Sequence, residues 1–220
     1  MKIYVLVCCC VFVILTNSVV SQAVNVRSTF DSDIDGWGYE GSGNLYYISQ
    51  GGHFSGYARY EDISGGGGDG WIIAPAKFHG DWTTLDGQGV LSWDHIILQA
   101  GGVGTILQAQ AMIEGPGGTA RCTTPEFMTE YWKEFSVPID ETAWWVISGT
   151  WADLISNVTV LKIRIEAVWN NASPLDIDGV DNVILTDERT LRTDLNRDGV
   201  VNFEDFAIMA AEWLETELWY

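Results

Sequence analysis

The sequence has few cysteines, and most of them lie at its very start. Cys8, Cys9 and Cys10 belong to an apolar N-terminal run, and Cys122 is the fourth. Beyond that run a single cysteine can form no internal disulfide, so burial, hydrogen bonding or metal binding must stabilise the fold. The small disulfide-stapled scaffolds that are common among exported domains are therefore excluded.

Basic residues are also scarce. The 220 residues include 11 lysines and arginines against 30 aspartates and glutamates, which gives a formal net charge of −19. Such a surface repels phosphate backbones, which disfavours nucleic-acid binding, but it is suited to holding calcium. A hydrophobic content of 47% with 11 tryptophans excludes a disordered chain.

Recognised catalytic motifs are absent as well. The chain has no Gly-x-Ser-x-Gly, no His-Glu-x-x-His and no phosphate-binding loop, and its histidines, His53, His79 and His95, are scattered. Two acidic residues could serve a glycosidase, but no pair sits in a recognisable setting. The sequence therefore favours a protein that is not an enzyme.

The first 23 residues predict a secretory signal peptide. Lys2 supplies a positive start, Ile3–Thr16 is apolar, and Asn17–Ala23 is polar and small. The apolar stretch is too short to span a bilayer comfortably, although an uncleaved anchor helix is the alternative. We therefore expect a secreted, extracellular or cell-surface protein that is not integral to a membrane after cleavage.

Residues 24–186 predict an all-β domain. Leu161, Ile163 and Ile165 alternate with Lys162, Arg164 and Glu166, as in a half-buried antiparallel strand. A short helical turn is expected at Trp151–Ser156. Further strands are expected at Leu45–Gln50, Gly56–Glu61, Trp71–Ile73, Val90–Leu98, Thr105–Ile113, Tyr131–Val137, Ala143–Ser148 and Val183–Thr186. This spacing, with glycine-rich turns between, favours a two-sheet jelly-roll β-sandwich.

The C-terminal segment predicts a calcium loop of EF-hand type followed by a helix. After a linker at 187–193, residues 194–220 carry oxygen donors at the spacing that Ca²⁺ needs, and Gly199 occupies the sharp turn. The alternative is a turn that caps the helix. The predicted ligands are Asp194, Asn196, Asp198, the carbonyl of Val200, Asn202 and Asp205.

This loop and helix resemble one repeat of a dockerin, the module that docks bacterial polysaccharide-degrading proteins onto cohesins. The resemblance implies calcium as the cofactor and a cohesin-like or surface protein as a partner. A complete dockerin has two such repeats, whereas residues 194–220 hold one. The matching residues are Asp194, Asn196, Asp198, Gly199, Val201, Asn202, Asp205, Phe206, Ala207 and Leu214.

The large domain is similar to the laminin B domain (laminin domain IV). The similarity lies in the opening Phe30–Gly38, in Trp71–Asp81 with Gly89–Trp93, and in the closing Asp181–Leu185. It implies a jelly roll related to carbohydrate-binding modules and a role without catalysis. In that fold group an aspartate of the last strand often helps to hold a structural calcium. A second metal site could therefore combine Asp181 with Asp178, Asp31 or Asp33, although 176–181 could instead be a solvated turn.

Three tryptophans are candidates for stacking on sugar rings. Trp144, Trp145 and Trp151 belong to an aromatic set larger than one core needs, and adjacent strand residues cannot both point inward. The alternative for each ring is core packing.

The first functional hypothesis is a non-catalytic calcium-binding module for carbohydrate or cell-surface polymer. The second is an assembly component docked through its C-terminus, with Phe203, Phe206 and Trp213 accessible. The third is a catalytic or accessory part of a polysaccharide-degrading system, which rests on analogy alone.

Overall fold

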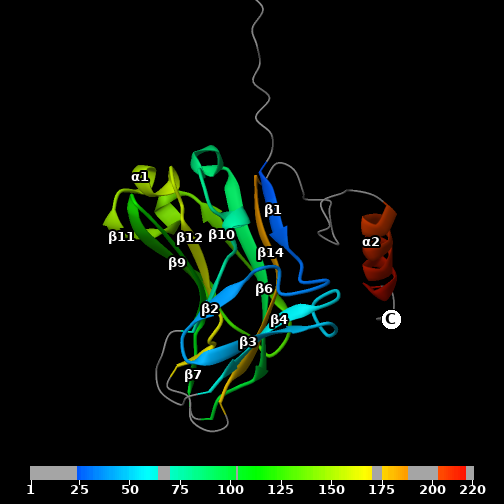
Figure 1. Ribbon diagram of the computed structural model, residues 1–220. Coiled ribbons are helices and arrows are strands. Elements are labelled where there is room, and N and C mark those ends of the chain that lie inside the picture. Colours follow the sequence, from blue (N-terminus) through cyan, green and yellow to red (C-terminus); the bar gives the residue numbers. More distant parts are fainter. Residues whose placement is uncertain (1–23, 64–69, 103, 170–174, 188–202, 217–220) are drawn as a thin grey trace, which may run out of the picture.

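Two antiparallel sheets of six strands each pack face to face, as the computed structural model shows (Figure 1). The structure describes residues 24–63, 70–102, 104–169, 175–187 and 203–216. Sheet A contains β1 (Asn25–Ser28), β3 (Gly43–Ile48), β4 (Tyr57–Asp62), β6 (Gly89–Gln99), β10 (Lys133–Ile139) and β14 (Ile177–Asp187). Sheet B contains β2 (Gly38–Glu40), β5 (Trp71–Ile73), β8 (Gln108–Gly115), β9 (Gly118–Phe127), β11 (Trp145–Gly149) and β12 (Val160–Arg164). The predicted jelly-roll β-sandwich is confirmed.

The remaining elements are short, apart from the last helix. Strands β7 (Thr105–Ile106) and β13 (Val168–Trp169) form a small ribbon. The helices are η1 (Ala76–Phe78), η2 (Thr83–Leu85), η3 (Glu141–Ala143), α1 (Trp151–Ile155) and α2 (Phe203–Thr216). Helix α1 confirms the predicted helical turn, and the Thr150 side chain caps it by accepting the Asp153 N–H. Among the described residues, no helix is long and apolar enough to cross a membrane.

The order of sheet A is β10-β6-β14-β4-β3, and β1 pairs with the far end of β14. Sheet B runs β11-β9-β8-β12-β5-β2. Because cross-strand partners share one face of a sheet, the register assigns each side chain to the core or to the outside. Trp93 of β6 opposes Phe135 of β10, and their rings stack with centroids 6.0 Å apart in the core. Asp94, the next residue, therefore points out of the sandwich.

Local sequence patterns did not predict strands β1, β2 and β9, of which β9 is the longest. Its inward residues are Ala120, Cys122 and Thr124, which are all buried but small. Pro125, which cannot donate a ladder hydrogen bond, further weakens the strand pattern. Backbone pairing with β8 and β11 on either side holds this strand in the sheet, although its own side chains have little hydrophobic volume.

Candidate functional site

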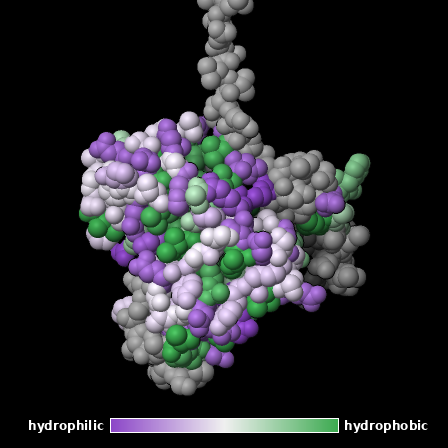
Figure 2. Space-filling view, in the orientation of Figure 1, coloured by the Kyte–Doolittle hydropathy of each residue, from purple (hydrophilic) through white to green (hydrophobic). Residues whose placement is uncertain are grey.

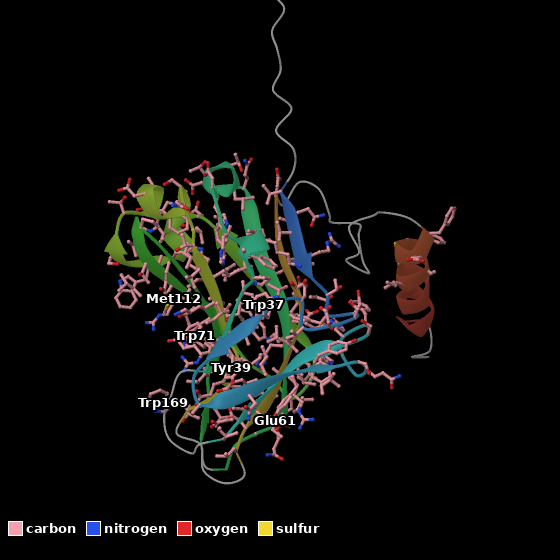
Figure 3. All side chains as sticks on the ribbon, in the orientation of Figure 1. Trp37, Tyr39, Glu61, Trp71, Met112 and Trp169 are labelled. Carbon is pink, nitrogen blue, oxygen red and sulfur yellow. The ribbon has the colours of Figure 1, made fainter. Side chains whose placement is uncertain are left out.

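The outer face of sheet B carries a row of side chains that crosses five of its six strands. Trp145 of β11 opposes Arg121 of β9, which opposes Met112 of β8. Met112 opposes Lys162 of β12, and Lys162 in turn opposes Ile73 of β5. Figure 3 labels Met112, which belongs to this row, and Trp71, which lies on β5 two residues before Ile73. The row alternates apolar and cationic groups over five strands.

A second row runs beside the first and is more deeply set. Arg164 of β12 opposes Trp71 of β5, and Trp71 opposes Glu40 of β2. The Arg164 guanidinium lies 5.7 Å from the centre of the Trp71 ring, and its Nη1 donates to Gln110 Oε1 at 3.2 Å. Arg164 and Trp71 are both buried, so the packing around them restricts the ring and the guanidinium to one arrangement.

Lys162 is held at the centre of this face by two carboxylates. Its ammonium lies 2.8 Å from Glu40 Oε2 and 2.8 Å from Glu114 Oε1. Burial lowers the pKa of Lys162, but the hydrogen bonds and charges of Glu114 and Glu40 outweigh burial and raise it. Lys162 therefore stays charged, and both glutamates are engaged in holding it.

At the β11 edge, Trp145 and Arg121 form an exposed pair. The Trp145 side chain is 62% exposed, and the Arg121 guanidinium lies 5.2 Å from the ring centre. Arg121 is of intermediate exposure, between a buried and an exposed side chain. A flat apolar ring beside a fork of N–H donors suits a ligand with one apolar face and oxygen acceptors at its rim.

Of the three tryptophans predicted to bind glycan, the structure keeps one accessible. Trp144 and Trp151 are each 4% exposed, lie 6.1 Å apart in the core, and donate their indole N–H groups to Pro138 O and Asp86 Oδ1. The prediction that these two rings face solvent is wrong, because α1 folds them between the sheets. Trp145 alone remains a candidate.

A second polar site lies on the outer face of sheet A. Asp94 and Asp181 oppose each other across β6 and β14, and the loop at 49–56 covers them. His53 Nδ1 lies 2.8 Å from Asp94 Oδ2, and the His53 backbone N–H donates to Asp181 Oδ2 at 2.8 Å. Asn182 Nδ2 donates to Asp94 Oδ2 at 2.8 Å. Burial raises the pKa of Asp181 to about 7, and the nearby Asp94 and Asp31 carboxylates add to the rise.

Aromatic rings cover this second polar site. His53 stacks on Phe54 with centroids 4.6 Å apart and on Trp132 at 6.4 Å, and Tyr57 meets Trp132 edge-on at 5.5 Å. Trp132 donates its indole N–H to Gly51 O at 3.0 Å, which ties the loop to the sheet. The rings bury the carboxylates, and their exclusion of water explains the raised pKa of Asp181.

The four aspartates predicted to share a metal are not brought together. Asp181 points outward and interacts with Asp31, whereas Asp178 opposes Ile97 and Tyr60 on the core face. Asp33 is exposed and accepts the Asp35 backbone N–H in its own loop. Asp178 fails as a partner because residues three apart on a strand lie on opposite faces. In the described part of the chain, no group of three or more His, Cys, Asp or Glu side chains is arranged to hold a metal.

Asp178 belongs instead to a cluster of carboxylates between the sheets. Asp62, Glu166, Asp176 and Asp178 are all at most 7% exposed. Burial raises the pKa of Asp178 well above its usual range, and Asp176 and Glu166 raise it further. Neither Asp178 carboxylate oxygen accepts a well-formed hydrogen bond from a donor.

Two neighbours of this cluster stay neutral. Burial lowers the pKa of His95 to about 4, so its imidazole, 3.5 Å from Asp178, makes no ion pair at neutral pH. Burial and the surrounding carboxylates raise the pKa of Tyr60 beyond its ordinary value of 10. Some carboxyl groups of this cluster must therefore be protonated, because neither His95 nor Tyr60 supplies a compensating positive charge.

Glu166 departs from the strand alternation that placed it outside with Lys162. The Gly70 carbonyl accepts from both the Ile165 and the Glu166 backbone N–H, which interrupts the regular pattern at that point. The Glu166 side chain is 3% exposed, and its Oε2 accepts the Gly70 N–H at 2.7 Å. The alternation of residues along one strand cannot predict an irregularity that depends on a glycine distant in the sequence.

The C-terminal calcium loop lies outside the described residues over 194–202, and the side chain of Asp205 does as well. Helix α2 is described from Phe203 onward, with the Phe203 side chain 89% and the Phe206 side chain 57% exposed. The Trp213 side chain also lies outside the description.

No family model and no curated protein matches the sequence. Solved structures do match its fold. A family 30 carbohydrate-binding module aligns at 15% identity over 81% of this chain and 97% of its own, with a TM-score of 0.51. An exo-beta-agarase aligns at 10% identity over 75% of this chain but 24% of its own, with a TM-score of 0.51. The L4b domain of human laminin alpha-2 aligns at 10% identity over 54% of this chain and 70% of its own, with a TM-score of 0.43. The chain is thus similar in fold to carbohydrate-binding β-sandwiches.

Proposed function

We propose that the β-sandwich is a non-catalytic module that binds carbohydrate on the outer face of sheet B. The observation that carries the proposal is the row from Trp145 to Ile73, which sets an exposed ring, hydrogen-bond donors and apolar surface in one line across five strands. A sugar chain presents alternating apolar ring faces and hydroxyl oxygens, and this row offers a partner to each.

The carboxylates on this face support binding rather than hydrolysis. A glycosidase needs one carboxyl group free to donate a proton and another free to attack or to activate water. Glu40 and Glu114 both contact the Lys162 ammonium, so their charges serve to position a lysine. The fold shared with a carbohydrate-binding module agrees with this role.

The test is an array of soluble and immobilised glycans, probed with residues 24–220 and with Trp145→Ala. We expect binding that the Trp145→Ala change abolishes, because it removes the exposed ring. Tyr131→Ala is the matched control: this ring is 64% exposed and precedes β10 of the opposite sheet. If Trp145→Ala and Tyr131→Ala retain equal binding, the face of sheet B is not the site.

We propose further that the loop at Asp194–Asp205 binds Ca²⁺ and that the chain is exported. The ligand spacing supports the first statement and the apolar leader supports the second. Isothermal titration of the chelator-treated protein with Ca²⁺ should give binding heat that Asp194→Ala with Asp198→Ala removes. Equal heats in both proteins would place calcium elsewhere, with Asp31 and Asp181 as the next ligands to replace.

Docking through helix α2 is a second candidate function. The exposed Phe203 and Phe206 side chains are three residues apart, so both lie on one helix face. A cohesin-coated surface should then retain the protein in Ca²⁺ and release it in chelator, whereas Phe203→Ala with Phe206→Ala should not bind. Retention of that double variant would exclude this face.

A further inference from the structure

We infer that the carbohydrate bound on sheet B is anionic, with a uronate carboxylate or a sulfate ester held by Arg121 beside the Trp145 ring. This inference rests on the proposed function and names the ligand class for the same site. It comes from an arginine that lies beside an exposed tryptophan ring and forms no ion pair with a described carboxylate.

The outer face of sheet B carries three of the 11 lysines and arginines of the chain. Arg121 lies on β9, whereas Lys162 and Arg164 both lie on β12, and β8 runs between these two strands. Glu40 and Glu114 hold Lys162, and the buried Glu166 carboxyl interacts with the Arg164 charge. Of the three cations, Arg121 is the one against which no described carboxylate is placed, on a chain whose formal net charge is −19.

Arg121 is the cation whose charge the protein does not compensate. Lys162 is matched by Glu40 and Glu114, and Arg164 is buried against Trp71 and Gln110. Among the described residues, no carboxylate forms an ion pair with Arg121, whose guanidinium lies 5.2 Å from the centre of the uncharged Trp145 ring. An arginine of intermediate exposure that lies beside an indole and lacks an acidic partner among the described residues can bind a carboxylate or sulfate of a ligand.

The geometry suits a pyranose ring that bears an anionic substituent. An apolar sugar face can stack on Trp145, while the planar guanidinium 5.2 Å away forms paired N–H···O bonds with a carboxylate or sulfate on the rim of the same ring. Uronates and sulfate esters share this chemistry.

The remote negative charge of the protein does not prevent this contact. At physiological ionic strength the screening length is about 8 Å, so carboxylates elsewhere on the surface are largely screened. A direct ion pair at Arg121 is screened much less.

The experiment compares short oligosaccharides of three kinds by titration calorimetry at physiological salt. The probes are oligogalacturonate and oligoalginate as uronates, carrageenan oligosaccharides as sulfate esters, and mixed-linkage β-glucan oligosaccharides as neutral sugars. We expect one anionic class to bind at least about tenfold more tightly than the neutral sugar. The preferred class identifies which anion the site takes.

Two arginine variants complete the test. Arg121→Gln should weaken binding of the anionic ligand by about tenfold or more, as expected when a charge-assisted hydrogen bond is lost. Arg59→Gln is the matched control, because Arg59 pairs with Glu61 on the opposite sheet, and it should leave affinity unchanged. Thermal melting shows whether both variants remain folded.

The outcomes separate this inference from the proposed function. If the neutral sugar binds as tightly as the anionic ones and Arg121→Gln has no effect, the anionic ligand class is wrong while carbohydrate binding stands. If no sugar binds to the folded protein, the proposed function and the inference both fail.

Discussion

Replacing Glu166 with glutamine should stabilise the protein at alkaline pH and change the pH dependence of its stability. Burial raises the pKa of Glu166 from its ordinary 4.5 to about 7, and the Asp176 and Asp62 carboxylates add to this rise. The Gly70 N–H and the Arg164 charge oppose the rise without cancelling it. Because the folded state holds the proton more tightly than the unfolded state, the stabilisation is complete below pH 4.5 and is lost as the pH rises through 7.

The magnitude follows from the shift. A rise from 4.5 to about 7 is about 2.5 pKa units, and at about 1.36 kcal/mol per unit it is worth about 3 kcal/mol of unfolding free energy. The Glu166 side chain is 3% exposed, so solvent screening does not reduce this figure much. Glutamine keeps an oxygen that can accept the Gly70 N–H, but it has no charge to be desolvated.

The assay is chemical denaturation of wild type and Glu166→Gln from pH 4.5 to pH 8.5, in chelator so that bound calcium does not contribute. The difference in unfolding free energy, Glu166→Gln minus wild type, should rise by about 3 kcal/mol from pH 4.5 to pH 8.5. The exposed Glu130→Gln is the control and should run parallel to wild type. If the difference between Glu166→Gln and wild type is the same at both ends of the range, Glu166 is not a buried carboxyl with a raised pKa.

Two substitutions and one labelling experiment test the core, one turn and the free thiol. Trp93→Ala removes a fully buried ring and should cost about 3–5 kcal/mol in urea denaturation, whereas exposed Tyr131→Ala should change stability by less than about 0.5 kcal/mol; equal losses would contradict the core assignment. Cys122 is 4% exposed and burial raises its pKa to about 11, so a thiol reagent at pH 8 should label it only after denaturation, and rapid labelling of native protein would refute its burial. Gly118→Ala should destabilise the fold by at least about 1 kcal/mol, because Gly118 has φ 139° and an added Cβ would meet Ser148 O at 2.0 Å; a melting temperature equal to that of wild type would show that this turn relaxes freely.

The features predicted correctly are those encoded by a local period. Leu161 and Ile163 face the core and Lys162 faces out, because alternation along one strand is enough to place them. The fates of Trp144 and Trp151 were not predictable in this way, since their burial depends on how α1 folds against both sheets. The polar site on sheet A was missed because Asp94, His53 and Asp181 come from two strands and a loop that only the tertiary fold brings together.

The candidate glycan-binding face was likewise predictable from the sequence only in part. Arg121 lies on β9, the strand without a clear hydrophobic pattern, so no local signal in the sequence places it beside Trp145. The scarcity of basic residues is visible in the sequence, but the placement of Arg121 opposite Trp145 depends on the register between two separate strands.

The place of β14 determines when this sandwich can form. It is the last strand of the domain, yet it lies inside sheet A, bonded to β6 along one edge and to β4 and β1 along the other. While the chain is being synthesised from its N-terminus, β4 and β6 must wait with unpaired edges until residues 177–187 emerge. This topology is dominated by non-local pairing, which favours slow folding and leaves strand edges of the unfinished chain open to edge-to-edge aggregation. A chain ending before Ile177 should be capturable by a separate peptide of the β14 sequence, which would complete the sheet from outside.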